Sequence, residues 1–279
     1  MVKRIKLVIG AGGVRGFFSL PIISRLLDAG VEIEAVSGSS IGSIIGSYLA
    51  LNKELESFVS LANSSKQELK RLFDYKLSKQ GLIKGDRIYK TLKRVYNNYS
   101  IRKVRLDLYI NSYNITKRRL VYFSNLNSNI LIANAIMASI SIPGLFRPFL
   151  YNRNYYVDAS FIDPLPISPF RIFVRKSVPK HKKQKTQKIV VFDFSNVELN
   201  AKSYSLINII ELVNLERSSL ISEMKLNLEG NNFNIYKIKP LFRVRSVHEF
   251  LKFDDWKKYY RYGLKFLEHN ENKLFDWIG

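Results

Sequence analysis

The pentapeptide Gly38-Ser39-Ser40-Ile41-Gly42 has the residue types and the spacing of a serine nucleophile. It follows an apolar segment with strand character, residues 33–37, and precedes an apolar segment with helical character, residues 41–51. A sharp turn between a strand and a helix exposes the middle serine, and the flanking glycines let the backbone pass closely. Ser40 is therefore the candidate nucleophile, and Ser39 is expected to pack or to hydrogen bond locally.

A serine nucleophile needs a base, and the histidines of this chain are poor candidates for that role. All of them lie in charged segments and are expected to be solvated: His181, His248 and His269. Only two strands are predicted before Ser40, which also argues against the Ser-His-Asp arrangement of α/β-hydrolases. Asp158 is better placed, because it ends the segment Tyr155–Val157, which is predicted to be a strand. A carboxylate that acts directly on Ser40 is therefore predicted, with Asp163 and Asp193 as fallback bases.

A glycine-rich turn, Gly10-Ala11-Gly12-Gly13-Val14-Arg15-Gly16, joins the first predicted strand to the first predicted helix. Such a turn directs backbone N–H groups toward one point beside a helix N-terminus, so it suits an anion. A dinucleotide site would need glycine in place of Arg15 and an acidic residue in place of Ser37-Gly38. No Gly-Lys-Ser/Thr follows, which excludes a P-loop. Two interpretations remain, a cradle for negative charge and a tight turn that uses glycine for close packing alone.

The hydrophobic pattern predicts the elements that must hold these residues in place. Strands are expected at residues 4–9 and 33–37, each followed by a helix, at 15–29 and 41–51. This alternation predicts an α/β fold with a central, mostly parallel sheet. Further along, the pattern predicts a hairpin (106–113 and 119–124), strands at 155–157, 188–194 and 233–238, and helices at 87–96 (capped by Asp86), 130–139, 205–228 and 254–269. No internal repeat and no linker divides the chain, so residues 1–279 are expected to form one domain.

Four segments of the chain, in order and at matching spacing, resemble the patatin-like phospholipase family. Residues 7–16 resemble its Gly-Gly-Gly-x-Arg-Gly oxyanion loop, and residues 36–43 resemble its nucleophile elbow. Residues 135–148 resemble its Ala-Ser-x-x-x-Pro-x-x-Phe-x-Pro segment, and Tyr156-Val157-Asp158-Ala159 stands where the family has Asp-Gly-Gly or Asp-Gly-Ala. The resemblance covers about residues 5–170, and on it the chain is identified as a member of this family.

The resemblance implies a three-layer α/β fold and a lipid acyl hydrolase of the phospholipase A or lysophospholipase type. It implies that Asp158 takes the proton of Ser40, that Ser40 attacks an ester carbonyl, and that water cleaves the acyl-serine intermediate. Backbone N–H groups of the glycine-rich turn would hold the oxyanion, at Gly12, Gly13 and Val14. Arg15 would hold the shape of this loop or contact a lipid phosphate. No metal or other cofactor is implied, and the sequence has no Asp/Glu cluster with the spacing of Ca²⁺ ligands.

Two positions depart from the family's pattern. Ala11 replaces the first glycine of the oxyanion loop, and Ala159 replaces the glycine after Asp158. Alanine resists positive φ angles, so a turn that requires one would displace the Asp158 carboxylate. The alternative function is therefore a weakly active or inactive patatin-like protein that acts as a module binding anionic membranes.

The net charge of the chain is strongly positive. Its 45 Lys and Arg residues against 23 Asp and Glu residues give +22, a balance that attracts anionic membranes or nucleic acid. Residues 171–188 are rich in these cations and contain no acidic residue, so they are expected to form a basic loop that contacts an anionic membrane surface. Nucleic acid is not the expected partner, because no recognised motif is present. Residues 204–279 are expected to form a mainly helical C-terminal part.

The composition and the length of the apolar runs limit which covalent links, metal sites and membrane segments the chain can have. The chain has no cysteine, which excludes disulfides and thiolate metal sites. No segment resembles a signal peptide or the ~20 apolar residues of a transmembrane helix. A cytoplasmic location with peripheral association to membranes is expected, whereas the sequence leaves the head-group preference and the oligomeric state open.

Overall fold

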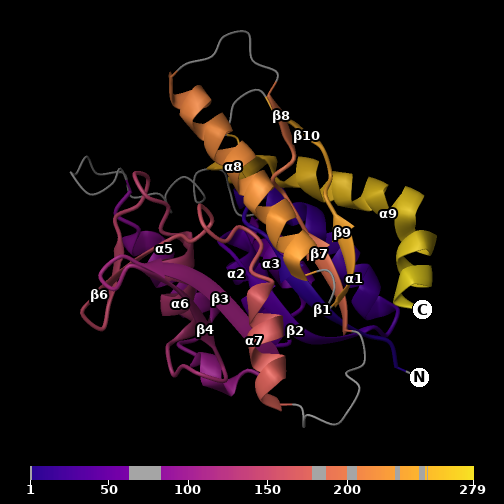
Figure 1. Ribbon diagram of the computed structural model, residues 1–279, viewed down its shortest axis with the longest axis horizontal. Coiled ribbons are helices and arrows are strands. Elements are labelled where there is room, and N and C mark those ends of the chain that lie inside the picture. The colour runs from indigo at the N-terminus through magenta and orange to yellow at the C-terminus, as the bar shows by residue number, and fades with distance from the viewer. Residues whose placement is uncertain are drawn as a thin grey trace.

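The computed structural model of the protein describes residues 2–62, 83–177, 187–199, 206–229, 233–244, 249 and 251–279. Its central feature is a sheet in the order β5-β6-β3-β2-β1-β7-β9, with β4 paired to β3 (Figure 1). The strands that run parallel to one another are β1 (Arg4–Ile9), β2 (Glu32–Gly38), β3 (Asp107–Asn114), β7 (Gln187–Phe192) and β9 (Phe233–Ile238). One edge is antiparallel and consists of β4 (Arg119–Ser124), β5 (Phe149–Tyr151) and β6 (Asn154–Val157). The predicted α/β class with a mostly parallel sheet is confirmed.

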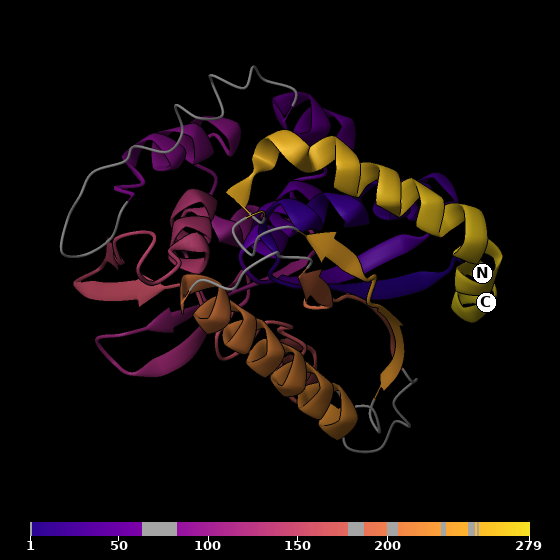
Figure 2. The ribbon, with the colours of Figure 1, turned by 90° about the horizontal axis from the view of Figure 1, so that it is seen from above.

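Helices cover both faces of the sheet and complete three layers (Figure 2). Leu7 and Ile9 of β1 belong to the larger hydrophobic cluster, whereas Val8 belongs to a second cluster on the opposite face. Successive side chains of a strand point to opposite faces, so this apolar run is typical of a strand that is buried on both. The larger cluster includes residues of α1 (Ser19–Asp28), α2 (Ile41–Ala50), α6 (Ile132–Ile140) and α9 (Trp256–Ile278), and the second includes residues of α7 (Ser168–Ser177) and α8 (Leu206–Glu229).

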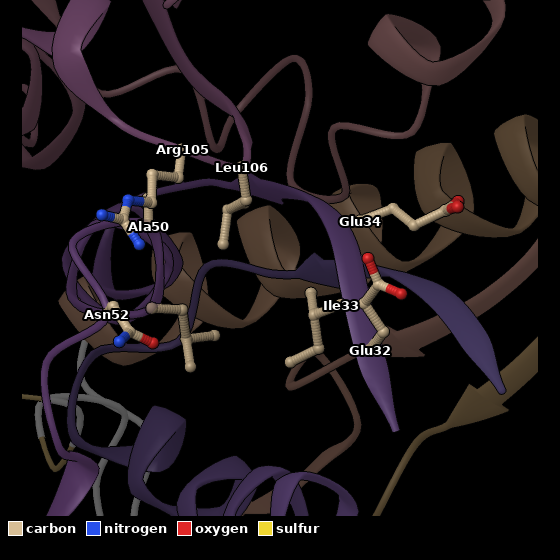
Figure 3. A pocket seen from close by; sticks show the side chains of 8 residues that line it. Glu32, Ile33, Glu34, Ala50, Asn52, Arg105 and Leu106 are labelled. Atoms are coloured by element: carbon tan, nitrogen blue, oxygen red, sulfur yellow. The ribbon is translucent and has the colours of Figure 1, made fainter. Parts of the chain in front are cut away.

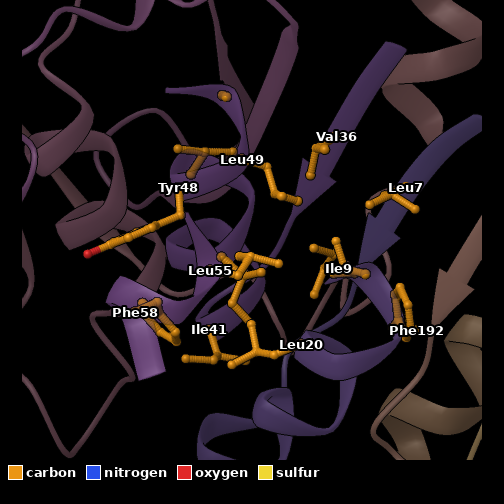
Figure 4. Close-up of a cluster of buried hydrophobic side chains, with 14 of the residues drawn as sticks. Leu7, Ile9, Leu20, Val36, Ile41, Tyr48, Leu49, Leu55, Phe58 and Phe192 are labelled. Carbon is orange, nitrogen blue, oxygen red and sulfur yellow. The ribbon is translucent and has the colours of Figure 1, made fainter. Parts of the chain in front are cut away.

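The larger cluster ties the first helices to the sheet. Figure 4 shows Leu49 of α2 beside Val36 of β2, and Leu20 of α1 between Ile41 of α2 and Ile9 of β1. The remaining elements are η1 (Gly13–Phe18), α3 (Leu55–Ala62), α5 (Asp86–Val95), η2 (Ile101–Lys103), β8 (Val197–Leu199), β10 (Phe242–Val244) and η5 (Phe253–Asp255). The strands β8 and β10 pair with each other, outside the main sheet. Among the residues described, no helix is both long and apolar enough to cross a bilayer.

Several sequence expectations need correction. The segment 171–188 was expected to be a basic loop, but α7 continues to Ser177 and β7 begins at Gln187. Residues 178–186 lie outside the described residues, so the rest of that expectation is untested. The predicted helix 15–29 is divided into η1 and α1, and Asp86 is the first residue of α5 rather than its cap, which is Gly85. The C-terminal part contains β9 and β10 as well as its helices.

Candidate active site

Ser40 lies in a strained turn between β2 and α2. Its φ is 53° and its ψ is −117°, a backbone conformation that side chains rarely adopt. The turn is possible because its flanking glycines have no Cβ. A Cβ built on Gly38 would stand 2.2 Å from the Gly42 carbonyl oxygen, and one built on Gly42 would stand 1.9 Å from the Ile9 carbonyl oxygen. The elbow predicted from the sequence is therefore enforced by close backbone contacts with β1 and within the turn.

Helix α6 supports this elbow from a distant part of the chain. The Ser40 amide donates a hydrogen bond of 3.0 Å to the Oγ atom of Ser139, which is fully buried. The carbonyl oxygen of Ser40 accepts hydrogen bonds from the amide and the hydroxyl of Ser43. Both backbone polar groups of Ser40 are therefore occupied, and only its side chain is left for chemistry. The contribution of Ser139 could not be inferred from the elbow motif, although Ser139 lies in the segment that carries the family resemblance.

Asp158 follows β6 and is held in a defined position. Its amide donates to the Ser141 carbonyl oxygen at 2.9 Å, and its Oδ1 atom accepts from the Ser160 amide at 2.8 Å. The residue is 2% exposed. Its second oxygen, Oδ2, is buried and accepts no hydrogen bond of normal geometry from the described residues. One carboxylate oxygen is therefore fixed by a hydrogen bond, and the other is left without one.

The environment of Asp158 raises the pKa of its carboxyl group toward neutral pH. Burial raises the pKa of Asp158 to about 6, while the Ser160 amide and the hydroxyls of Ser40 and Ser160 act in the opposite direction. The Ser40 hydroxyl is thus close enough to stabilise the charged carboxylate, although the contact is not a well-aligned hydrogen bond. Such contacts are often long before a substrate binds and tighten afterwards. The structure places the two residues singled out in the sequence in one site.

The glycine-rich turn lies beside the elbow, at the carboxyl end of β1. It is anchored at its start, because the Gly10 amide donates to the Phe192 carbonyl oxygen and the Ala11 amide donates to the Pro164 carbonyl oxygen. Within the described chain, the next two amides, of Gly12 and Gly13, donate no hydrogen bond. Gly13 has a φ of 56°, which favours glycine, and the buried Val14 follows it in η1. The turn therefore presents consecutive unused N–H groups.

The two alanines that depart from the family's pattern are compatible with their turns. The described non-glycine residues with positive φ include neither Ala11 nor Ala159. The Ala159 carbonyl oxygen accepts the amides of both Ile162 and Asp163 at 2.8 Å, which closes the turn after Asp158. Ala159 is fully buried, so its methyl group fills space in a packed site. The displacement of Asp158 that would follow from a positive φ at Ala159 is therefore not observed.

Arg15 points into the protein rather than toward solvent. It is 7% exposed, and its Nε atom donates to the Gly12 carbonyl oxygen at 3.0 Å. Burial lowers the pKa of Arg15 to about 10, while Tyr259 and Asp193 favour the charged form. Tyr259 belongs to α9, so the C-terminal helix closes over this side chain. Of the two roles considered for Arg15, the geometry favours holding the loop over contacting a lipid phosphate.

The fallback bases have other partners. Asp163 is fully buried, pairs with Lys225, and accepts hydrogen bonds from Tyr122 at 2.6 Å and Asn111 at 3.2 Å. Asp193 accepts hydrogen bonds from the Ser195 amide and hydroxyl. These contacts are typical of structural carboxylates.

The histidines do not enter the site where they can be placed. His269 is exposed on α9, where its Nδ1 atom lies 2.8 Å from the Lys265 carbonyl oxygen. His181 and His248 lie outside the described residues. In the described ranges, no group of three or more His, Asp or Glu side chains is arranged to bind a metal ion.

A cavity of about 410 Å³ lies elsewhere, at the amino end of β2 (Figure 3). Its lining includes Glu32 and Glu34 of β2 together with Arg105. Ser40 follows the opposite end of the same strand. The cavity is therefore separate from the candidate active site and has no part in its chemistry.

Comparisons with known proteins identify the family of the chain. A model of the family described as patatin-like phospholipase matches residues 7–171. An uncharacterized NTE family protein of Mycobacterium tuberculosis is 28% identical over 167 residues, which cover 60% of this chain and 45% of the relative. The lysophospholipase NTE1 of Phaeosphaeria nodorum is 28% identical over 170 residues, which cover 60% of this chain but 11% of that protein. This chain thus spans less than half the length of these curated relatives.

The fold is also found in a solved structure. The crystal structure of VipD from Legionella pneumophila superposes with a TM-score of 0.53 at 14% identity, covering 96% of this chain and 67% of that one. The family match includes the elbow, the glycine-rich turn and Asp158, and it extends over more than half of the 279 residues. This chain belongs to the patatin-like phospholipase family.

Proposed function

We propose that the protein is a serine acyl hydrolase that cleaves fatty-acyl esters of phospholipids, as a phospholipase A or a lysophospholipase does. The observation that supports the proposal is that Ser40, in its strained turn, lies near the buried Asp158, whose pKa is raised to about 6. A carboxylate with this pKa is charged at neutral pH and is a stronger base than an ordinary aspartate. Family membership and the name of the fungal relative support a glycerolipid as the substrate.

In the proposed mechanism, Oδ2 of Asp158 accepts the proton of the Ser40 hydroxyl as Oγ attacks the ester carbonyl carbon. The carbonyl oxygen becomes an oxyanion, and the amides of Gly12 and Gly13, with that of Val14, stabilise it. Losing one donor of such a site typically lowers the rate by ~10²–10³. Collapse of the intermediate breaks the ester bond, and Asp158 returns its proton to the departing alcohol oxygen. Water then attacks the acyl-serine with Asp158 again as base, which releases the fatty acid and restores Ser40.

The surrounding residues position this pair. Ser139 fixes the Ser40 amide, and the Ser160 amide fixes Oδ1 of Asp158, so that Oδ2 remains available to the nucleophile. Arg15 holds the Gly12 carbonyl and thereby the direction of the neighbouring amides. These residues keep the reacting groups in register, which contributes to the rate because small misplacements in a pair of this kind are costly.

The test is turnover of a short, soluble fluorogenic ester, followed by mass spectrometry of the products from a mixed phospholipid panel. Ser40→Ala and Asp158→Asn are each expected to lower kcat/KM by about 10³-fold or more. His269→Gln, an exposed position on α9, is the control and should retain the parental rate. A Ser40→Ala protein that stays active would overturn the proposal, whereas an inactive parent protein would favour the alternative of a module that only binds membranes.

We also propose peripheral binding to anionic membranes through the basic segment 171–188, in keeping with the charge of +22. Its cations at residues 180, 182, 183 and 185 lie outside the described residues, so the support is the sequence alone. Replacing Lys180, Lys182, Lys183 and Lys185 with Gln should weaken binding to anionic vesicles, and binding should weaken as salt rises.

A further inference from the structure

Two hairpins stand side by side at the antiparallel edge of the sheet. Residues 115–118 connect β3 to β4, and Asn152-Arg153 connect β5 to β6. The tips are joined, because the Ile115 amide donates to the Tyr155 carbonyl oxygen and the Tyr155 amide donates to Oγ1 of Thr116, both at 2.9 Å. Figures 1 and 2 place both hairpins away from the C-terminal end of α9. We call the exposed residues of these joined tips the hairpin-tip surface.

Large apolar side chains of the hairpin-tip surface face solvent. Leu150 is 55% exposed and Tyr155 is 47% exposed, and the two stand directly opposite each other on β5 and β6. Ile115, at the adjoining tip, is 40% exposed. Residues opposite each other on paired strands share a face, so Leu150 and Tyr155 form a continuous apolar pair.

The same hairpin tips also carry cations. The exposed basic residues are Lys117, Arg118, Arg119 and Arg153. None of them forms an ion pair with a carboxylate of the described residues. The sequence from residue 108 to residue 157 contains no Asp or Glu. The surface therefore combines uncompensated positive charge with exposed apolar and aromatic side chains, which suits an anionic lipid interface.

Two of these arginines occupy backbone conformations that disfavour them. Arg118 has a φ of 48° and Arg153 has a φ of 59°. Glycine or asparagine is usual at such turn positions, as Asn152 with a φ of 45° illustrates. Each hairpin thus presents an arginine at its tip where glycine would relieve backbone strain. Strain of this kind is typical of functional positions.

The hairpin-tip surface lies at the same end of the sheet as the candidate active site, beyond the carboxyl ends of β2 and β3. Gly38, two residues before Ser40, is paired with Ile110 of β3, and β3 continues for four more residues to Asn114. The tips therefore extend beyond the carboxyl end of β2, where Ser40 lies. From the tip, β6 runs back toward the site and ends at Val157, next to Asp158.

We propose that the hairpin-tip surface docks the protein on an anionic phospholipid interface, with its arginines and lysine on lipid phosphates. Tyr155, Leu150 and Ile115 enter the boundary between head groups and acyl chains. The proposal rests on the proposed function, because it supplies the route by which phospholipid reaches Ser40. It concerns described residues on a different part of the chain from segment 171–188.

The experiment measures vesicle binding by cosedimentation in a Ser40→Ala background, so that turnover does not enter the result. Vesicles of phosphatidylcholine alone are compared with vesicles of phosphatidylcholine and phosphatidylglycerol. The double variant Arg118→Gly with Arg153→Gly removes two charges and relieves two positive φ angles, so its melting temperature should not fall. Binding to the anionic vesicles is expected to weaken about 30-fold. The matched control, Arg261→Gln with Lys273→Gln on α9, removes the same charge and should bind as the parent does.

A second pair of changes tests the apolar part. Leu150→Ser with Tyr155→Ser should weaken binding to anionic vesicles more at high salt than at low salt. At low salt the remaining cations still hold the protein on the vesicle, whereas at high salt their attraction is screened and the apolar contact is needed. The proposal is overturned if the double glycine variant binds anionic vesicles as tightly as the parent does. It is overturned as well if the glycine variant and the control pair lose the same affinity, which would show a response to net charge alone. It is also overturned if the parent binds a nucleic acid duplex but no anionic vesicle. The proposed function is tested separately by ester turnover with Ser40 intact, so either can fail alone.

Discussion

The Ser40 amide donates a hydrogen bond to the Oγ atom of Ser139 at 3.0 Å, across a sequence separation of 99 residues. Two residues further on, the Ser141 carbonyl oxygen accepts the Asp158 amide at 2.9 Å. The short segment 139–141 therefore contacts the backbone of both members of the proposed pair. The relative position of nucleophile and base depends on this segment as much as on the turns that carry them.

Ser139→Ala is expected to lower kcat on a soluble ester by about tenfold, because the Ser40 amide loses its acceptor and the elbow is free to shift. An unsatisfied buried N–H group should also lower the free energy of unfolding by about 1–3 kcal/mol. The readouts are kcat with its pH profile and a denaturant titration. Ser57→Ala on the exposed part of α3 is the control. If both variants behave alike, Ser139 does not position the nucleophile.

The pH dependence of kcat/KM should report the Asp158 carboxylate. With a pKa raised to about 6, Asp158 is protonated at lower pH and cannot accept the Ser40 proton. The logarithm of kcat/KM is therefore expected to rise with a slope of one below about pH 6 and to level off above it. A neutral soluble ester keeps the substrate from contributing. A profile that stays flat down to about pH 4, the usual range of an aspartate, would contradict the raised pKa of Asp158.

Asp158→Asn should stabilise the fold while it removes activity. The folded-state pKa of about 6 exceeds the ordinary aspartate pKa of 3.8, so the unfolded chain releases this proton at lower pH. Above about pH 6 the charged, buried carboxylate therefore lowers the free energy of unfolding, by about 2–3 kcal/mol. The effect shrinks as the pH falls from about 6 toward 4, and it vanishes below about pH 3, where the group is protonated in both states. Denaturant titrations of parent and variant at pH 7.5 and pH 4 should diverge much more at the higher pH, and equal stability at both would contradict the assignment.

Ala159→Gly is expected to leave kcat unchanged. The sequence suggests strain at this position, but Ala159 does not have a positive φ, so glycine relieves nothing. Glycine also increases the freedom of the unfolded chain and removes a buried methyl group, which should lower the free energy of unfolding by about 1 kcal/mol. Steady-state kinetics and thermal melting check both parts. A clear rise in kcat would mean that the methyl group holds Asp158 away from its working position.

The parts of this site that local sequence determines could be predicted. Ser40 is identified by the glycines on either side of it, which form a short motif in the sequence. The strands β1 and β2 are recognised from their apolar runs. Asp158 could be placed only by its position at the end of a strand and by the family's order of motifs. Neither signal gives the raised pKa, which results from burial.

The parts that depend on distant contacts could not be predicted. The orientation of Arg15 is set by α9, which lies more than 200 residues later in the sequence, so both roles remained open. Helix α7 was missed because a cationic run begins inside it and hides its apolar positions. The strand β5 has three residues, too few for a period to be recognised. The family resemblance includes residues 139–141, but it does not indicate that this segment contacts the backbone of both Ser40 and Asp158.

Helix α8 lies outside residues 7–171, yet its side chains contact the turn that follows Asp158. Arg217 donates to the Phe161 carbonyl oxygen, Ser218 contacts the Ser160 carbonyl oxygen, and Lys225 pairs with the buried Asp163. A segment cut at the boundary of the family match would keep Ser40 and Asp158 but would leave the Asp163 carboxylate without its cation. Exchanging this segment between relatives would therefore require α8 to be exchanged with it. The part of the chain that must stay together is larger than the region that matches the family.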